Sequence, residues 1–335
     1  MKLYFNFKNY IILVSSNEEK LLKKLESEFY FFKSLDFDEI NLEIQLNLNL
    51  PPEIPSMVAS QIEETCCIYE FAGRQYQDYH GKSLLIKNMD ENLIQIFSRD
   101  EDEIFELSFL TIHSYLGMAL DKKGFSRIHA LGFSLFDSKT LVMLPSKGGK
   151  STLLSHLIED PNVKIISDDM PLISISGDIH SFPSKISLAT KPEKGSLSQL
   201  NWDIFNRTLY PPKYIASLSQ LSERIDISTD CKEQNLVYGL RLSHGKSILT
   251  KVSKWKMIMP LFKNMIIGIG LPQIIQHILT YKLLDFFRLF GFALMRSICA
   301  VQLLMKSNCY YFYMGHDIEQ NVNMLKNISH EQIDR

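Results

Sequence analysis

The stretch Leu141-Val-Met-Leu-Pro-Ser-Lys-Gly-Gly-Lys-Ser-Thr-Leu-Leu154 decides how the rest of the chain is interpreted. Its first residues are apolar and predict a buried strand. A turn with two glycines follows, and the residues from 151 to 158 then have the amphipathic pattern of a helix. Strand, glycine turn and helix in this order form a cradle for phosphate, because glycine lets backbone N–H groups approach the oxygens and a helix N-terminus adds positive potential.

The residues expected to bind the phosphates of a nucleotide are consecutive: Ser146, Lys147, Gly148, Gly149, Lys150, Ser151 and Thr152. In this interpretation Lys150 compensates the charge of the β- and γ-phosphates, and the Ser151 hydroxyl is a ligand of Mg²⁺. The loop departs from the G-x-x-x-x-G-K-[ST] pattern at Leu144, where the pattern has glycine. The alternative interpretation is an ordinary solvated turn between a strand and a helix.

Two carboxylates follow the next predicted strand. Residues 163–167 are mostly apolar, and Asp168 and Asp169 come directly after them. Neighbouring side chains on extended backbone point to opposite sides, so one acid can face a metal while the other faces an acceptor. Taken alone, such a pair is more often a turn that caps its own backbone. Because it follows a phosphate-binding lysine, we predict that Asp169 binds Mg²⁺ together with Ser151 and that Asp168 acts as a base.

A histidine, His129, precedes two short apolar strands that lead into the loop. By itself it would be an ordinary, partly buried histidine. The order of His129, hairpin, loop 145–152, helix, strand and acidic pair resembles the HPr kinase/phosphorylase family. It is most similar to the HPr-kinase-like kinases of peptide-modifying gene clusters, such as the lasso peptide kinases. The segments 182–188 and 310–321 resemble a later strand and the last strand-turn-helix of that family.

The resemblance covers about residues 105–328 and implies an α/β fold with a P-loop kinase core of the HPr kinase and phosphoenolpyruvate carboxykinase type. It implies an ATP-dependent kinase with Mg²⁺ that phosphorylates a hydroxyl on a peptide or small protein, with serine as the favoured acceptor residue. The catalytic residues that it implies are His129, Lys150, Asp168 and Asp169, with His129 beside Asp168. A homo-oligomer is left open because the founding family is oligomeric. The signature that the founding enzymes carry for phosphorolysis has no copy here.

Three basic residues, Lys147, Lys213 and Arg241, are candidates to neutralise the transferred phosphate, with a solvated surface charge as the alternative for each. A second function remains open, namely a nucleotide-binding regulatory or assembly protein without phosphoryl transfer. An enzyme like phosphoenolpyruvate carboxykinase is not favoured, because the sequence shows no cluster of metal ligands.

The sequence predicts two domains. Residues 1–102 are expected to form a small α+β domain with strands near 2–14, 40–48, 66–71, 82–87 and 93–97 and a helix over 16–35. Residues 103–328 are expected to form the kinase domain, including the C-terminal helices. Residues 41–49 alternate polar and apolar side chains, and we expect an edge strand there that an acceptor peptide could extend. The alternative is that this domain only covers apolar surface of the kinase.

Composition agrees with a cytoplasmic protein of 335 residues. A net charge of −2 gives no basic footprint for nucleic acid. The five cysteines lack metal-site spacing and are expected to be reduced thiols. The N-terminus is expected to be a strand pair and not a signal peptide. The apolar region 283–305 includes charged residues, so core or interface helices are expected there in place of a membrane span.

Overall fold

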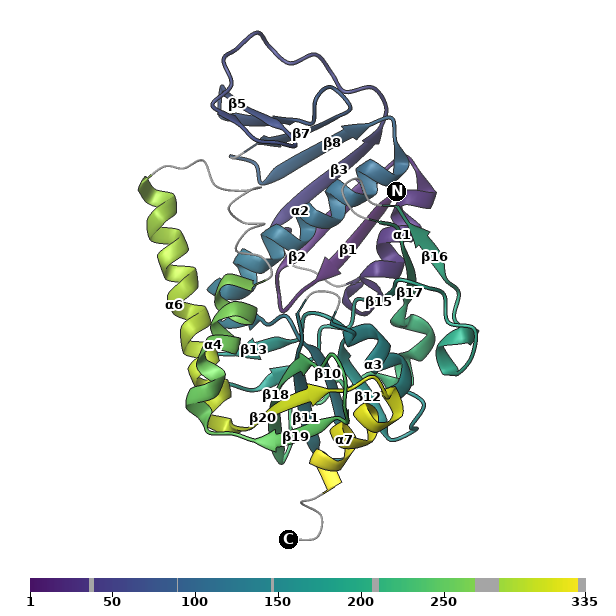
Figure 1. The fold of residues 1–335 in the computed structure, drawn as a ribbon. Helices are drawn as coiled ribbons and strands as arrows, with labels where there is room; N and C mark the ends of the chain where they lie inside the picture. Colours follow the sequence, from purple (N-terminus) through teal and green to yellow (C-terminus); the bar gives the residue numbers. More distant parts are fainter. Residues whose placement is uncertain (36–38, 89, 146–147, 207–210, 269–282, 331–335) are drawn as a thin grey trace. The chain divides into compact units, whose positions relative to one another are not determined.

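The structure, a computed structural model, describes residues 1–35, 39–88, 90–145, 148–206, 211–268 and 283–330 (Figure 1). The chain divides into two compact units. Unit 1 comprises Met1–Leu116 and Ile204–Pro212, and unit 2 comprises Gly117–Asp203 and Lys213–Arg335. The first division falls after Leu116, later in the chain than the boundary expected after residue 102. Ser146 and Lys147, which we expected in the phosphate loop, lie outside the described residues.

Unit 1 contains an eight-stranded sheet with the strand order β1-β2-β3-β8-β7-β6-β5-β4. Its elements are β1 (Lys2–Asn6), β2 (Ile11–Ser16), α1 (Glu19–Glu28), a 3₁₀ turn η1 (Tyr30–Phe32), β3 (Leu42–Leu48), β4 (Gln61–Ile62), β5 (Cys67–Phe71), β6 (Arg74–Asp78), β7 (Ser83–Asn88), β8 (Leu93–Ser98) and α2 (Glu101–Lys122). The expected strands and the N-terminal strand pair are present. Strands β4 and β6 were not expected, and α1 is shorter than the helix predicted over 16–35.

Strand β3 lies in the interior of this sheet, so the prediction of an edge strand at residues 41–49 was wrong. It pairs in parallel with β2 on one side and with β8 on the other. The alternation of side chains identified the two faces of the strand correctly, because Leu42, Ile44 and Leu46 are buried. Alternation carries no information about which strands lie on either side. An acceptor peptide therefore cannot extend the sheet at β3.

Unit 2 contains a six-stranded sheet with the order β12-β10-β11-β18-β20-β19 and two smaller sheets. Its elements up to residue 224 are β9 (Phe125–Arg127), β10 (Leu131–Leu135), β11 (Ser138–Met143), α3 (Lys150–Leu157), β12 (Val163–Ser167), β13 (Leu172–Ser174), β14 (Ile179–His180), β15 (Lys185–Leu188), η2 (Ser196–Gln199), β16 (Asp203–Phe205, crossing between the units), β17 (Lys213–Ser217) and η3 (Leu218–Arg224). The later elements are β18 (Glu233–Arg241), β19 (Ile248–Lys251), η4 (Lys254–Met257), α4 (Ile258–Leu261), the π-helical η5 (Phe262–Gly268), α6 (Leu283–Lys306), β20 (Ser307–Met314) and α7 (Ile318–His330).

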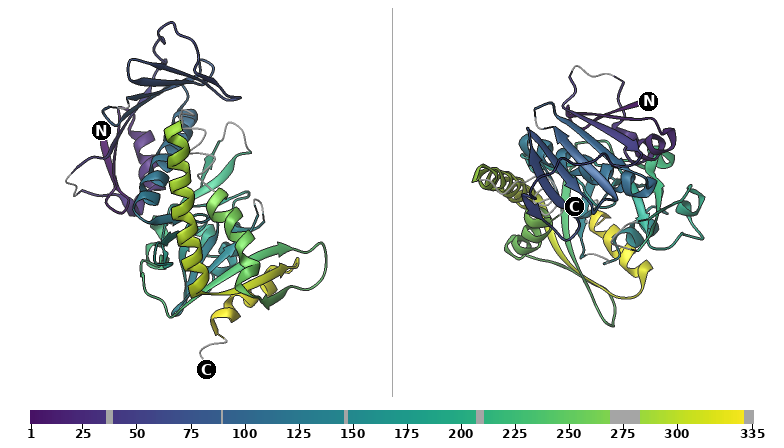
Figure 2. Two further views of the ribbon diagram at one scale, coloured as in Figure 1. Left: turned by 90° about the vertical axis from the view of Figure 1, so that its left-hand side faces the viewer. Right: turned by 90° about the horizontal axis from the view of Figure 1, so that it is seen from above.

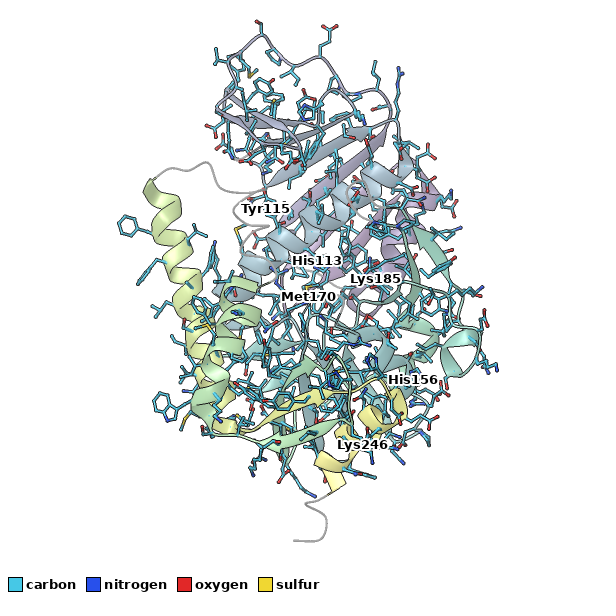
Figure 3. The ribbon with its side chains drawn as sticks, in the orientation of Figure 1. His113, Tyr115, His156, Met170, Lys185 and Lys246 are labelled. Carbon is cyan, nitrogen blue, oxygen red and sulfur yellow. The ribbon has the colours of Figure 1, made fainter. Side chains whose placement is uncertain are left out.

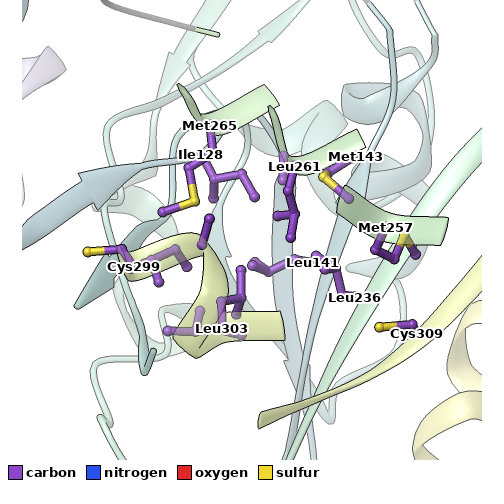
Figure 4. Close-up of a cluster of buried hydrophobic side chains, with 14 of the residues drawn as sticks. Ile128, Leu141, Met143, Leu236, Met257, Leu261, Met265, Cys299, Leu303 and Cys309 are labelled. Carbon is purple, nitrogen blue, oxygen red and sulfur yellow. The ribbon is translucent and has the colours of Figure 1, made fainter. Parts of the chain in front are cut away.

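The three strands β11, β18 and β20 run parallel, and β10 runs against β11 and β12. One face of this sheet packs against η4, α4, η5 and α6 through a buried apolar cluster (Figure 4). The cluster draws Leu141 and Met143 from β11, Leu236 from β18, and Cys299 and Leu303 from α6. Burial of these side chains is the main force that fixes the helices on the sheet.

Helix α6 is also apolar on its other side. Among the described residues, its segment Leu289–Lys306 is the one helix long and apolar enough to cross a membrane, by length and composition alone.

With its mixed sheets and its helices the chain is a mixed α/β protein, and the expectation of an α/β fold is confirmed at this level.

Candidate functional site

The expected site residues come from three segments that meet at one edge of the six-stranded sheet, namely the edge formed by the ends of its strands. Strands β11 and β12 end at this edge, and β10 begins there, because Leu131 of β10 lies opposite Val142 and Gly132 lies opposite Ser167. The segment before β10 carries His129, the turn after β11 carries the glycines, and the turn after β12 carries the acidic pair. Met170, the residue after this pair, and Lys185, the first residue of β15, are labelled in Figure 3.

The turn between β11 and α3 depends on both of its glycines. Gly149 precedes the first residue of α3 with a φ of 98°, in the left-handed region that favours glycine. The N–H of Gly148 donates to the carbonyl of Pro145 at 2.9 Å, and a Cβ on Gly148 would lie 2.7 Å from that same oxygen. Helix α3 then begins at Lys150, one residue before the expected start, and the first turn of the helix follows the glycines directly.

Lys150, His129 and Asp169 form a chain of contacts. The Nζ of Lys150 lies 2.7 Å from Nε2 of His129, and Nδ1 of His129 lies 3.0 Å from Oδ1 of Asp169. Lys150 also approaches this oxygen at 3.5 Å and donates to the carbonyl of Leu144 at 3.4 Å. A charged Lys150 can only donate, so in that state Nε2 of His129 accepts from it and the ring proton lies on Nδ1, which contacts Asp169 without a well-aligned hydrogen bond.

The expected pairing of His129 with Asp168 is therefore wrong, since the histidine contacts Asp169 instead. The first carboxylate of the pair belongs to a different group of contacts. Its Oδ2 accepts from the Ser151 hydroxyl at 3.0 Å and from the backbone N–H of Ser187 at 3.3 Å. The two acids do point to different partners, as expected for neighbours on extended backbone. Which acid faces which side depends on the arrangement of β10, β12 and β15, and the sequence does not show it.

The two carboxyl groups also differ in their electrostatic surroundings. Burial raises the pKa of Asp168 to about 6, and the neighbouring charge of Asp169 adds to the shift. Burial also acts to raise the pKa of Asp169. For this half-exposed carboxyl, however, the contact with His129 and the nearby positive charge of Lys150 prevail and hold the pKa below its ordinary value. Burial lowers the pKa of Lys150, while the two aspartates oppose this shift.

The residues around Asp168 suit a small, hard cation. Its Oδ1 is buried and has no hydrogen-bond partner among the described residues, while its Oδ2 adjoins the Ser151 hydroxyl. Carboxylate and hydroxyl oxygens are ligands that Mg²⁺ prefers. In the part of the chain that the structure describes, no group of three or more His, Cys, Asp or Glu side chains could hold a metal ion. A cation here would therefore complete its shell with water and phosphate oxygens, as Mg²⁺ usually does.

Two of the expected phosphate-neutralising residues lie at the same edge. Arg241 ends β18, the strand beside β11, and its Nη1 would be 3.6 Å from a Cβ on Gly149. Lys213 begins β17 and donates to the Ser187 hydroxyl at 3.3 Å, and its charge acts on the pKa of Lys150 and of Asp169. Thr152 is exposed on the first turn of α3. Lys147 lies outside the described residues.

The sequence analysis missed Ser187 as a site residue. Its backbone N–H and its hydroxyl connect Asp168 to Lys213. The only signal was its place in the segment 182–188, which was assigned to a strand without a role. A serine within a strand gives no sign that its backbone contacts a carboxylate in the turn after a strand of another sheet. No protein-family model matches the chain, and no curated protein matches it.

Proposed function

We propose that the protein is an ATP-dependent kinase with a P-loop core of the HPr kinase type. It phosphorylates a hydroxyl on a peptide or small protein, with serine as the favoured acceptor residue. The observation that carries this proposal is the pair of contacts behind the glycine turn. Ser151 donates to Asp168, and Lys150 reaches Asp169 through His129. Phosphoryl transfer depends mainly on positioning and charge compensation, and these contacts supply both.

The glycine turn and the basic residues would bind the phosphates. Backbone N–H groups at the start of α3 point out of the helix end, where they favour anions. Lys150 is nearly buried, so its charge would act on a phosphate with little screening by water. Arg241 and Lys213 extend the positive surroundings along the same edge.

Asp168 and Ser151 would hold Mg²⁺, which supplies charge neutralisation of the phosphates when it is bound. This assignment replaces the expected one, in which Asp169 was the metal ligand. The buried Oδ1 of Asp168 supports the change, since an unpaired carboxylate oxygen in the interior is costly without a cation.

Asp169 would accept the proton of the acceptor hydroxyl. Its side chain is half-exposed, so an acceptor can reach it, and His129 holds it in place. A carboxylate with a lowered pKa is a weak base, but in a loose transition state the hydroxyl proton leaves late, and a strong base is not needed. We place the reaction in the cytoplasm, and the described cysteines are all free thiols.

Calorimetry with Mg·ATP tests the cradle. Lys150→Ala should weaken the affinity by at least about 100-fold, because the variant loses the charge that faces the phosphates. Lys232→Ala is the matched control, since Lys232 precedes β18 at the opposite edge of the sheet. An affinity that is unchanged in Lys150→Ala would exclude the proposed site.

Transfer itself is tested with γ-labelled ATP and a panel of serine-containing peptides. Asp169→Asn should lower turnover by about 100-fold, the usual contribution of a general base. Asp168→Asn should instead raise the Mg²⁺ concentration needed for half-maximal binding of ATP. Binding of Mg·ATP without transfer to any peptide would favour a nucleotide-binding regulatory or assembly protein.

A further inference from the structure

Unit 2 has a large apolar surface that the proposed kinase reaction does not use. We define this apolar face by the exposed side chains of η4, α4, η5 and α6: Trp255, Ile258, Met259, Phe262, Ile267, Phe290, Leu294, Ile298, Val301 and Met305. Trp255 is 81% exposed and Met305 is 64% exposed. In Figure 2 the green helical segment from η4 to η5 lies beside α6, and α6 contacts η4 and η5. A soluble protein rarely exposes a continuous apolar patch of this kind without a binding partner.

The exposed stripe of α6 has the spacing of one helix face. Phe290, Leu294, Ile298, Val301 and Met305 follow one another every three or four residues. The opposite face is buried through Phe292, Cys299 and Leu303, so α6 is apolar on both sides. A helix that is apolar all round is expected either inside a protein or in contact with lipid. Side chains project outward from α6 on the side away from the sheet (Figure 3).

Positive charge accompanies the part of the apolar face that comes from η4, α4 and η5. Lys251, Lys254, Lys256 and Lys263 are exposed in the segment that carries its first half, and the Lys254 ammonium donates to the carbonyl of Met305 at the end of α6. Asp285 is the only acidic residue in the sequence from residue 251 to residue 306. Exposed aromatic and aliphatic side chains among lysines are typical of proteins that bind anionic lipid at the membrane surface.

We propose that the apolar face binds the surface of a bilayer that contains anionic lipid, with α6 lying along the interface. Crossing the bilayer is incompatible with the contacts of this helix. Arg296 is buried against Asp121, Lys306 pairs with Asp178, and the inner face belongs to the apolar cluster of the sheet. A second copy of the chain is a poorer occupant, because it would bury these lysines against a segment whose only acidic residue is Asp285. An anionic surface complements them.

Sedimentation with vesicles tests the proposal on the full chain. The protein should sediment with phosphatidylcholine vesicles that contain phosphatidylglycerol, less with phosphatidylcholine alone, and less at high salt. Lys256→Glu with Lys263→Glu should weaken binding to the anionic vesicles by at least about tenfold, and Phe290→Gln with Leu294→Gln by a similar factor. Ile227→Gln and Lys232→Glu are the matched controls, since both residues are well exposed and lie outside the apolar face.

A second readout comes from tryptophan fluorescence. The chain has two tryptophans, so Trp202→Phe leaves Trp255 as the only reporter, and its emission should shift to the blue on anionic vesicles. The proposal is overturned if the protein stays in the supernatant with both kinds of vesicle. It is also overturned if the stripe variant and the Ile227 control bind equally. Self-association in ultracentrifugation that Leu294→Gln abolishes, without vesicle binding, would assign the face to a second copy.

Discussion

At the scale of single residues, the site depends on the difference between two neighbouring carboxyl groups. Asp168 is buried and has a raised pKa, whereas Asp169 is half-exposed and has a lowered pKa because of its positive neighbours. One acid therefore suits a cation that replaces its missing partner, and the other suits a mobile acceptor. A pair that only capped its own turn would not direct one carboxylate oxygen to the Ser151 hydroxyl on α3 and leave the other buried without a partner among the described residues.

The raised pKa of Asp168 predicts a dependence of stability on pH. Its folded pKa of about 6 exceeds the ordinary value of 3.8, so the folded protein binds this proton more tightly. Stability should therefore fall as the pH rises from about 4 to about 6 and stay lower above that range. Asp168→Asn removes the group that titrates and therefore this fall in stability with rising pH. In the absence of Mg²⁺, denaturant unfolding should show that the free energy of unfolding of the variant, relative to that of the wild type, rises by up to about 3 kcal/mol from acidic to neutral pH.

The change with pH is the informative quantity, because Asn also alters the hydrogen bonds of the site. A difference between variant and wild type that is the same at both pH values would contradict the raised pKa of the buried Asp168. Asp168→Asn should at the same time lose affinity for Mg·ATP. Greater stability together with lost binding is expected of a residue kept for function and not for folding.

At the scale of elements, the glycine turn before α3 is strained for any other residue. Gly149→Ala forces a side chain into the left-handed region and should cost about 1 kcal/mol of stability. The added methyl group would also lie beside Arg241, so affinity for Mg·ATP should fall. Gly81→Ala is the matched control. Gly81 has a φ of 75° with open space around its Cβ position, so it has the same strain but no part in the site.

Thermal unfolding and calorimetry on both variants separate the two effects. Both should melt earlier, and only Gly149→Ala should bind Mg·ATP more weakly. Equal affinities in the two variants would mean that the turn does not contact the nucleotide.

The attachment of α6 to the rest of unit 2 depends on a buried ion pair. Arg296 and Asp121 are 1% and 2% exposed, and Nη2 of Arg296 donates to Oδ2 of Asp121 at 2.6 Å. Arg296 is the positive group with the largest effect on the buried Asp121 carboxyl, ahead of Arg127, so Arg296→Met should cost about 3–5 kcal/mol. Arg296→Lys keeps a positive charge near Asp121 and should be more stable than Arg296→Met. Urea unfolding of both variants checks this order, and the reverse order would contradict it.

The sequence predicted most elements correctly but few of their neighbours. The strand, turn and helix at residues 141–157 follow from local pattern and turn chemistry, and so does the burial of alternate residues in β3. The position of β3 inside the sheet, the partner of His129 and the contact of Ser187 with Asp168 depend on strand order. Strand order is decided by packing between segments distant in sequence, which periodicity does not record. Strand β6 was missed because its polar residues gave no apolar pattern.

At the scale of the whole molecule, the described residues of the proposed nucleotide site all belong to unit 2. Its strands come from Gly117–Asp203 and from the segment after Lys213, and unit 1 contributes none of them. A ligand that binds only the folded state stabilises the unit that binds it, by about 2.7 kcal/mol at a concentration 100 times its Kd. Local opening in the other unit need not change.

Hydrogen exchange with and without Mg·ATP tests this separation. Backbone amides at the start of α3 and in the turns after β11 and β12 should exchange more slowly with the nucleotide present, because these segments would surround the phosphates. Amides in the centre of the unit 1 sheet, in β3 and β8, are the internal control and should change much less. Lys150→Ala should abolish the protection in unit 2. Protection confined to unit 1, or protection that persists in this variant, would place the nucleotide elsewhere and contradict the proposed site.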